Sequence, residues 1–333
     1  MPRISILLPC RNAAAHLAAA IASIQQQTYT DYEVIAIDDG SSDATLDLLT
    51  GWAERDERVR VLPGAGAGIV AALCQAAAAA SGELLARMDA DDVARPARLE
   101  RQVTFLAQHP AVGACGTRVR YFPDEIVRAG ARRYEHWLNS LATPEQVDRD
   151  LFVECPIAHP ALVMRRSVFD VAGGYQDHGW PEDYDLVLRM RATGALLANV
   201  PEVLLEWREG DTRLSRTAGR YGEWQFQRCK AHHLVRMRGD RRDFVVWGAG
   251  PVGKRFARAL HGEGAHITAF VDLDPRKIGQ VIHGARVIAP EGIADVRNRY
   301  VVAAVAGAAA RAEIRAALVA ARLVEVNDFC AVA

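Results

Sequence analysis

The sequence lacks any run of about eighteen apolar residues, the length that a membrane-spanning helix needs. The Ala-rich stretch 71–80 comes closest, but it is short and contains Cys74 and Gln75. The chain starts Met1-Pro2-Arg3 and lacks the basic start, long apolar segment and small-residue cleavage site of a signal peptide. We therefore expect a cytoplasmic protein, soluble or attached peripherally at the inner face of a membrane.

Paired cysteines and an excess of one charge are also missing. The six cysteines are scattered, and none forms a C-x-x-C pair, which is typical of reduced thiols rather than a disulfide framework or a zinc site. The net charge of -1 argues against a nucleic-acid binder that works by phosphate neutralisation. The 333 residues are half hydrophobic and a quarter charged, as expected for a globular protein of two domains.

Three carboxylates crowd into four positions directly after an apolar run of strand length. The run Leu84–Met88 is followed by Asp89, Asp91 and Asp92. Like charges so close gain nothing for folding unless a cation shares them. Carboxylate oxygens suit Mg²⁺ or Mn²⁺, so the stretch predicts a metal site at a strand end, against the alternative of a solvated acidic turn.

Short apolar strands alternate with helical patterns through the first half of the chain. Strands are predicted at 4–8, 33–37 and 59–62, with helices at 13–27 and 44–55. This alternation predicts a parallel sheet, whose ligands bind beyond the carboxyl ends of the strands. The pair Asp38 and Asp39 follows the second strand and lies at such an end.

The stretch 86–92, followed by Pro96, Arg98, Leu99, Glu100 and Gln102, resembles the metal-binding Asp-x-Asp segment of family 2 glycosyltransferases with a GT-A fold. Further motifs of that family occur in order over residues 1 to about 225. The resemblance implies that Asp91 and Asp89 hold Mn²⁺ or Mg²⁺ against a nucleotide-sugar donor. It also implies two nucleotide-contacting loops, one containing Pro9, Arg11 and Asn12 and the other Asp38 and Asp39, with Asp39 the favoured partner of the base or ribose. The glycine loop 64–68 departs from the family, which usually has Asn there and where Cys74 stands.

The stretches 156–175 and 180–189 resemble the second half of the GT-A domain. By that resemblance Glu182 and Asp183 start a helix beneath the acceptor, and Asp183 is the catalytic base. Trp180 and Glu182 are assigned to acceptor contact or helix support. His159 either lines the site or is a hydrogen-bonded structural residue. Residues 123–150 are expected to be irregular and to contact the acceptor.

Residues 213–242 contain nine Lys or Arg against two acidic residues. They predict either the charged face of a linker helix or attraction to donor phosphates or an anionic membrane. Arg213 and Arg216 are the candidates for phosphate contact.

A second α/β pattern follows, with a strand at 242–247, a G-x-G-x-x-G turn, a helix at 254–261 and a strand at 267–271. The turn places Gly248, Gly250 and Gly253 before a helix, and Asp272 ends the next strand. This order predicts a Rossmann-like unit that binds NAD(P) or another nucleotide, or one that only regulates or assembles the enzyme.

We therefore expect an α/β protein with a GT-A domain at 1–225, a basic linker helix at 226–241 and a small Rossmann-like domain at 242–333. The favoured function is an inverting glycosyltransferase that moves a sugar from a nucleotide diphosphate, UDP by preference, to a glycan or lipid-linked acceptor. The alternatives are an NAD-dependent nucleotide-sugar oxidoreductase and a catalytically silent nucleotide-sugar-binding protein. The sequence names neither the sugar nor the oligomeric state.

Overall fold

The computed structural model describes residues 3–210, 213–239, 243–296 and 298–333. Its internal contacts divide the chain into two units. Unit 1 comprises Met1–Val147, Pro156–His178 and Glu182–Thr217, and unit 2 comprises Asp148–Cys155, Gly179–Pro181 and Ala218–Ala333. Among the described residues, no helix has both the length and the apolar character that crossing a bilayer requires.

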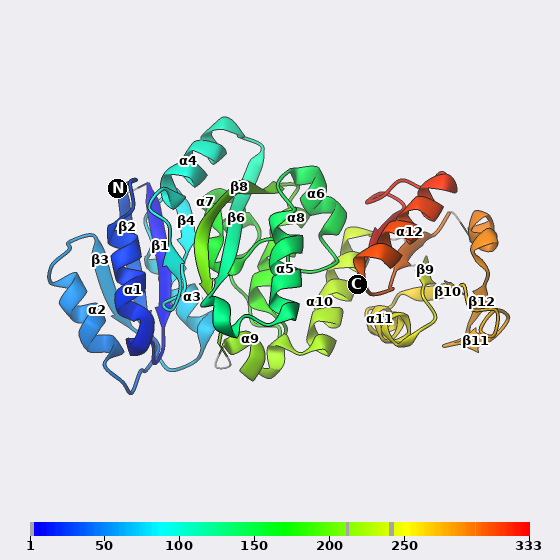
Figure 1. The fold of residues 1–333 in the computed structure, drawn as a ribbon, viewed down its shortest axis with the longest axis horizontal. Coiled ribbons are helices and arrows are strands. Elements are labelled where there is room, and N and C mark those ends of the chain that lie inside the picture. The colour runs from blue at the N-terminus through cyan, green and yellow to red at the C-terminus, as the bar shows by residue number, and fades with distance from the viewer. Residues whose placement is uncertain (1–2, 211–212, 240–242, 297) are drawn as a thin grey trace. The chain divides into compact units, whose positions relative to one another are not determined.

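Unit 1 is built on a mostly parallel sheet of eight strands (Figure 1). In spatial order they are β3 (Val59–Pro63), β2 (Tyr32–Asp38), β1 (Ile4–Cys10), β4 (Leu84–Arg87), β7 (Val163–Arg165), β6 (Val112–Phe122), β8 (Leu196–Arg208) and β5 (Val93–Ala94). Strands β3, β2, β1 and β4 run parallel, and β6 runs parallel to β8, whereas β7 is antiparallel to both its neighbours and β5 is antiparallel to β8. The predicted α/β fold with a mostly parallel sheet is confirmed.

Helices flank this sheet. They are α1 (Ala14–Gln25), α2 (Thr45–Ala53), α3 (Ile69–Ala79), α4 (Arg98–Gln108), α5 (Ala129–Asn139), α7 (Arg166–Val171), α8 (Glu182–Ala192) and α9 (Leu214–Thr217), with α6 (Pro144–Asp150) ending in unit 2. Every residue of β1 and β2 is buried, which explains why their sequences are continuous apolar runs instead of alternating patterns.

The stretch 123–150 corrects one prediction, because it is mostly helical rather than irregular. It contains α5, α6 and the short 3-10 helix η1 (Asp124–Ile126). Helix α5 packs on β6 through Tyr134, Trp137 and Leu138. These apolar residues have helical spacing, but they are few among charged residues, and the weak pattern hid the helix.

Unit 2 has its own six-stranded sheet. In spatial order its strands are β11 (Val281–Ile282), β12 (Ala285–Ile288), β10 (His266–Val271), β9 (Asp243–Trp247), β13 (Tyr300–Ala303) and β14 (Phe329–Ala331), and only the β11–β12 pair is antiparallel. Its helices are α10 (Glu223–Met237), α11 (Pro251–Gly262) and α12 (Ala308–Ala320). Three further 3-10 helices are η2 (His159–Ala161) in unit 1 and η3 (Gly219–Tyr221) and η4 (Pro290–Val296) in unit 2.

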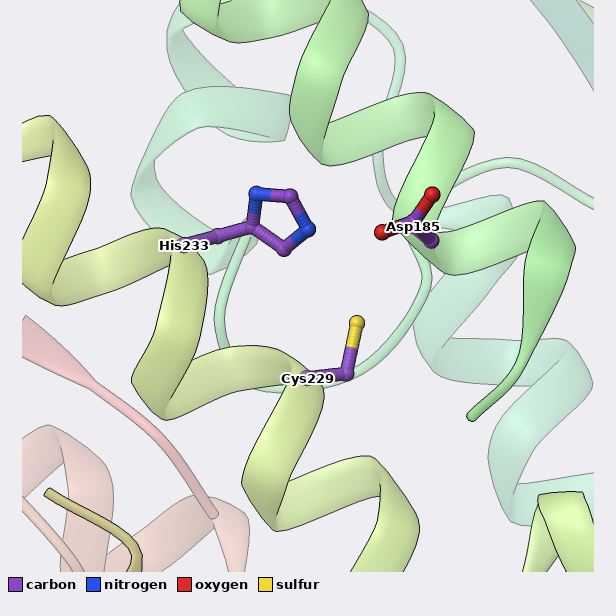
Figure 2. A group of neighbouring side chains, drawn as sticks. All are labelled: Asp185, Cys229 and His233. Carbon is purple, nitrogen blue, oxygen red and sulfur yellow. The ribbon is translucent and has the colours of Figure 1, made fainter. Parts of the chain in front are cut away.

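Helix α10 covers most of the predicted linker, and its contacts place it inside unit 2, against α11. The buried ammonium of Lys230 donates to the carbonyl oxygens of Val153 at 2.7 Å and Val332 at 3.1 Å. Lys230 thus links three separate segments of unit 2, which is why the division does not follow the chain order. Two other residues of α10, Cys229 and His233, project from it one turn apart, while Asp185 belongs to α8 of unit 1 (Figure 2).

Candidate functional site

The predicted acidic cluster forms a compact turn at the carboxyl end of β4. Asp89, Asp91 and Asp92 each present a carboxylate oxygen, and these oxygens lie within 4.8 Å of one another. The backbone N–H of Arg208, the last residue of β8, donates to Oδ1 of Asp92 at 2.7 Å. Its Nε donates to the carbonyl oxygen of Asp91, also at 2.7 Å. The end of β8 therefore holds the turn in place.

The electrostatics of this turn favour a cation. Burial and the neighbouring Asp89 carboxylate raise the pKa of Asp91 to about 6. Burial, with Asp89 and Asp91 beside it, also raises the pKa of Asp92 well above its usual value. Oδ2 of Asp92 is buried and has no hydrogen-bond partner. Crowded carboxylates and an unsatisfied buried oxygen fit a hard divalent ion such as Mg²⁺ or Mn²⁺.

The two predicted nucleotide loops lie at the same edge of the sheet as the acidic turn, because β1 lies between β2 and β4. Pro9 is in β1, opposite Ile37 of β2. Asp39 is 4% exposed, and its backbone N–H donates to the carbonyl oxygen of Cys10 at 2.8 Å. The guanidinium of Arg11 lies 3.6 Å from Oδ2 of Asp39.

Asp38 and Asp39, the two acids of the second loop, each have one carboxylate oxygen without a hydrogen bond. Asp38 accepts a long hydrogen bond from the N–H of Ser41 at 3.3 Å, and Asp39 accepts one from the N–H of Gly68 at 2.8 Å. In both residues Oδ1 is buried without a partner. A buried carboxylate oxygen without a donor is costly, and the N–H or hydroxyl of a nucleotide would satisfy it.

Asn12 has a structural part in this loop. It has a positive φ of 49°, its Oδ1 accepts the N–H of Ser42 at 2.8 Å, and its own N–H donates to the hydroxyl of Ser41 at 2.9 Å. Asn12 therefore ties the two predicted loops together. The glycine loop supports the same site, since the N–H of Gly68 is used by Asp39.

The Glu182–Asp183 pair begins α8, as predicted. Glu182 is 1% exposed, whereas Asp183 is half-buried and accepts the N–H of Tyr184 on Oδ1 at 2.7 Å. The charges of Arg87, Glu182, Asp183 and Asp89 all act on the buried hydroxyl of Tyr175, whose pKa is raised chiefly by burial. The structure therefore brings the start of α8 and the acidic turn to the same part of unit 1.

His159 is a buried structural residue in this structure. Its Nε2 lies 2.9 Å from the hydroxyl of Tyr175, with which it shares a hydrogen bond. Burial and the nearby Arg87 lower the pKa of His159 well below its usual value, so the ring is neutral at pH 7. Of the two interpretations from the sequence, the geometry favours the hydrogen-bonded structural one.

Arg213 and Arg216 share one buried acid. Glu209, which is 4% exposed, lies 3.7 Å from the Nη1 of Arg213 and 2.6 Å from the Nη2 of Arg216. The guanidinium of Arg213 also stacks over Trp207, 4.6 Å from the ring centre. Burial and Asp89 raise the pKa of Asp91, and the charge of Arg213 partly offsets this rise, so Arg213 lies near the acidic turn. That position suits a phosphate contact.

Trp180 belongs to unit 2 by its contacts. Its ring centre lies 5.1 Å from that of His232, and the guanidinium carbon of Arg228 lies 5.6 Å from it. These contacts lie within unit 2 and use the charge of Arg228, one residue of the basic segment, while the predicted role of Trp180 in acceptor contact or helix support stays a prediction. Arg238 is used similarly, because it covers the ring of Tyr300 at 4.2 Å and donates to the carbonyl oxygen of Asn327 at 3.0 Å.

The G-x-G-x-x-G turn has the expected strand–turn–helix setting. A Cβ at Gly253 would lie 1.8 Å from the carbonyl oxygen of Gly248, so this glycine is required by packing, whereas Gly250 has no atom within 4 Å of such a Cβ. Both oxygens of Asp272 already accept hydrogen bonds, from Ala249 at 2.8 Å, Lys277 at 2.9 Å and Asp274 at 2.9 Å. Nothing in these contacts supports NAD(P) binding.

Several residues of the site escaped the sequence analysis, namely Arg87, Arg208, Glu209, Trp207 and Tyr175. Arg87 alone had a local signal, because it is a charged residue inside an otherwise apolar strand. The others act through contacts between distant segments, which no spacing in the sequence reveals.

Comparison with known proteins identifies the class. Residues 5–172 match the family described as glycosyl transferase family 2. A putative glycosyltransferase of Bacillus subtilis, EpsE, is 31% identical over 225 residues, covering 66% of this chain and 78% of that protein. The amylovoran biosynthesis glycosyltransferase AmsE of Erwinia amylovora is 30% identical over 61% of this chain and 74% of its own. An uncharacterised glycosyltransferase of Haemophilus influenzae is 30% identical over 62% of this chain, but the match spans only 65% of that protein.

Solved structures share the fold. TarS residues 1–349 of S. aureus, in complex with UDP-GlcNAc, align with a TM-score of 0.55 and 14% identity over 78% of this chain and 71% of that one. The mannosyltransferase PcManGT of Pyrobaculum calidifontis, in complex with GDP-Man and Mn²⁺, aligns with a TM-score of 0.50 and 23% identity over 79% and 69%. The chain therefore belongs to glycosyl transferase family 2, as the resemblance in its sequence implied.

Proposed function

We propose that this protein is an inverting glycosyltransferase that moves a sugar from a nucleotide diphosphate, UDP by preference, to a glycan or lipid-linked acceptor. The observation that carries the proposal is the acidic turn, whose three carboxylate oxygens lie within 4.8 Å of one another at the carboxyl end of β4. It lies at the same end of the parallel strands as the loop of Asp38 and Asp39, with only β1 between their strands, and each of these two acids has a buried oxygen that lacks a donor. Together they offer a cation site beside a nucleotide site.

The nucleotide-sugar donor and the metal are supported by the structural relatives, whereas the preference for UDP comes from the resemblance in the sequence. TarS was solved with UDP-GlcNAc and PcManGT with GDP-Man and Mn²⁺. In this chain Asp91 and Asp89 would hold the divalent ion, which would neutralise charge on the departing diphosphate. The charge of Arg213 acts on Asp91 of the same turn, and Arg213 would help to neutralise the diphosphate. Asp39, with Asp38 beside it, would accept from the base or ribose of the donor.

The chemistry of transfer needs a group that takes the proton of the acceptor hydroxyl on the face opposite the leaving group. Asp183 is our candidate, because it lies in the first turn of α8, where the helix dipole favours an ionised carboxylate. Glu182, buried beside it, would hold the start of the helix. Single displacement by the acceptor would invert the anomeric carbon.

The acceptor class rests on the relatives' printed roles. AmsE acts in amylovoran biosynthesis, and another relative, WbnJ of Escherichia coli, acts in O-antigen biosynthesis with 28% identity. A cell-surface polysaccharide or its lipid-linked precursor is therefore the substrate class that we propose. Cytoplasmic location and peripheral membrane contact stay predictions.

The test starts with binding. The full chain would be melted with UDP-glucose, UDP-GlcNAc or GDP-mannose, each with and without Mn²⁺, since a ligand that binds only the folded state raises its apparent stability. We expect one nucleotide sugar to stabilise the protein in a metal-dependent way and its nucleotide to be released when the acceptor is added. Turnover that changes the absorbance at 340 nm would instead indicate the oxidoreductase. Failure of every nucleotide sugar to bind would refute the proposal.

A further inference from the structure

Two arginines lie beneath the acidic turn with almost no exposure. Arg87, the last residue of β4, is 1% exposed, and Arg98, the first residue of α4, is 2% exposed. A buried guanidinium is costly unless hydrogen bonds and opposite charges compensate it. Their position therefore calls for an explanation in terms of what they contact.

Both arginines hold the backbone that leads into the turn. The guanidinium of Arg87 donates to the carbonyl oxygen of Met88 and to Oδ1 of Asp89. Arg98 donates to the carbonyl oxygen of Arg87 at 2.6 Å, and its Nε donates to Gln102 at 3.2 Å. The two guanidinium groups thus fix the backbone of residues 87–89 through protein contacts alone.

The same two groups offset most of the charge of the turn. Three carboxylates and these two guanidinium groups leave a formal charge of -1 when all are ionised, and the guanidinium groups of Arg208 and Arg213 add further positive charge beside the turn. A divalent cation arriving alone meets this small net charge and is repelled by the nearby guanidinium of Arg87. A nucleotide diphosphate brings further negative charge and oxygen ligands, which Mg²⁺ and Mn²⁺ prefer.

We propose that Arg87, supported by Arg98, is a positioning residue that holds the acidic turn ready for metal and makes a divalent cation bind weakly alone and tightly only together with a nucleotide diphosphate. This inference rests on the proposed function, because it assigns the acidic turn to the metal of the donor. The inference differs from a purely structural role in the direction in which it predicts the metal affinity to change. Removing the charge of Arg87 should strengthen the binding of metal alone, whereas loss of a purely structural residue would weaken it or leave it unchanged.

The experiment measures Mn²⁺ binding to the full chain by electron paramagnetic resonance, without nucleotide and with UDP or GDP. We expect Arg87→Met to bind Mn²⁺ alone about tenfold more tightly than the wild type, and to lose most of the gain that the nucleotide gives. Arg87→Lys keeps the charge and should stay within about twofold of the wild type for Mn²⁺ alone. Arg101→Met is the matched control, because Arg101 lies on α4 with 55% of its side chain exposed.

Unchanged or weaker Mn²⁺ binding by a folded Arg87→Met protein would overturn the inference. If that variant and Arg87→Gln are unfolded without metal, circular dichroism with excess Mn²⁺ decides. Refolding would support the inference, because the ion then replaces the missing cation, and continued unfolding would overturn it. If the wild type does not bind a nucleotide at all, the proposed function is refuted instead. Failure of the inference on Arg87 and failure of the proposed function are therefore distinguishable.

Discussion

Asp92 and Arg208 are joined by a hydrogen bond from the backbone N–H of Arg208 to Oδ1 of Asp92 at 2.7 Å, across 116 positions of sequence. One oxygen of Asp92 is therefore used to fix the turn to β8, and the other is buried without a partner. Asp91 has its carbonyl oxygen held by the same arginine, at 2.7 Å, while its carboxylate takes part in the cluster. The backbone of the turn is thus fixed by protein contacts, which leaves the carboxylate of Asp91 for a ligand.

We predict that Asp91→Ala abolishes sugar transfer while the melting temperature without ligand stays within a few degrees of the wild type. The substitution removes a metal ligand but no contact that holds the turn, because β8 contacts the carbonyl oxygen of residue 91 and not its side chain. Transfer assays and calorimetry would measure the two effects. Asp47→Ala, at an exposed acid of α2, is the control and should keep full activity. Full activity of the wild type in excess EDTA would contradict the metal role.

The pH dependence of the metal-free protein follows from the pKa of Asp91, which is raised to about 6. The folded state then holds a proton that the unfolded chain releases near its ordinary pKa of 3.8. The contribution of Asp91 to stability therefore falls as the pH rises from about 4 to 6, and above 6 the ionised group is destabilising. Asp91→Asn should remove this effect.

Calorimetry of the metal-free protein at pH 5 and pH 7.5 checks that prediction. The difference in melting temperature, Asp91→Asn minus wild type, should be larger at pH 7.5 than at pH 5. In the wild type, Mn²⁺ must displace the same proton, so its affinity should weaken below pH 6. An equal difference in melting temperature at both pH values would show that burial and Asp89 do not raise this pKa.

The sequence predicted those parts of the molecule that depend on local pattern. The alternation of short strands and helical patterns predicted the mostly parallel sheet, and β1, β2 and β3 each contain a stretch that was predicted as a strand. The predicted irregular stretch 123–150 was wrong, because α5 is held by two aromatic residues and one leucine against β6. The basic composition of α10 predicted a helix there, but its sequence does not reveal that Lys230 donates to carbonyl oxygens 77 and 102 positions away.

For the site, the sequence located the acids but not what holds them. Asp89, Asp91 and Asp39 stand at strand ends, which a pattern of apolar runs reveals. The contact of Gly68 with Asp39 and that of Arg208 with Asp92 join segments far apart in the chain. Such contacts depend on the order of strands in the sheet, and that order cannot be read from the pattern of a single sequence.

The glycine turn of unit 2 gives a prediction on stability. Gly253→Ala should lower the melting temperature markedly, because its Cβ would lie 1.8 Å from the carbonyl oxygen of Gly248 and the turn would have to move. Gly250→Ala is the matched control, with no atom within 4 Å of the new Cβ and an ordinary φ of −88°. Calorimetry of the full chain measures both. Equal melting temperatures of the two variants would show that the turn is not packed as described.

The last prediction concerns Asp183 as the base. Its alternative role is to cap α8, since Oδ1 accepts the N–H of Tyr184 at 2.7 Å in the first turn. Asp183→Asn separates the two roles, because Asn serves as a helix cap nearly as well as Asp but does not accept a proton from the acceptor at neutral pH. We expect the rate of transfer to fall by about 10²–10⁴ while donor affinity is retained, which is the range for removal of a general base.

Steady-state rates, donor binding and the anomeric configuration of the product together decide this assignment. Asp177→Asn, at another acid of unit 1, is the control and should keep the wild-type rate. A small loss in Asp183→Asn would leave only the cap role. A product that retains the configuration of the donor would overturn single displacement even if the variant were inactive, because a base acting on the opposite face must give inversion at the anomeric carbon.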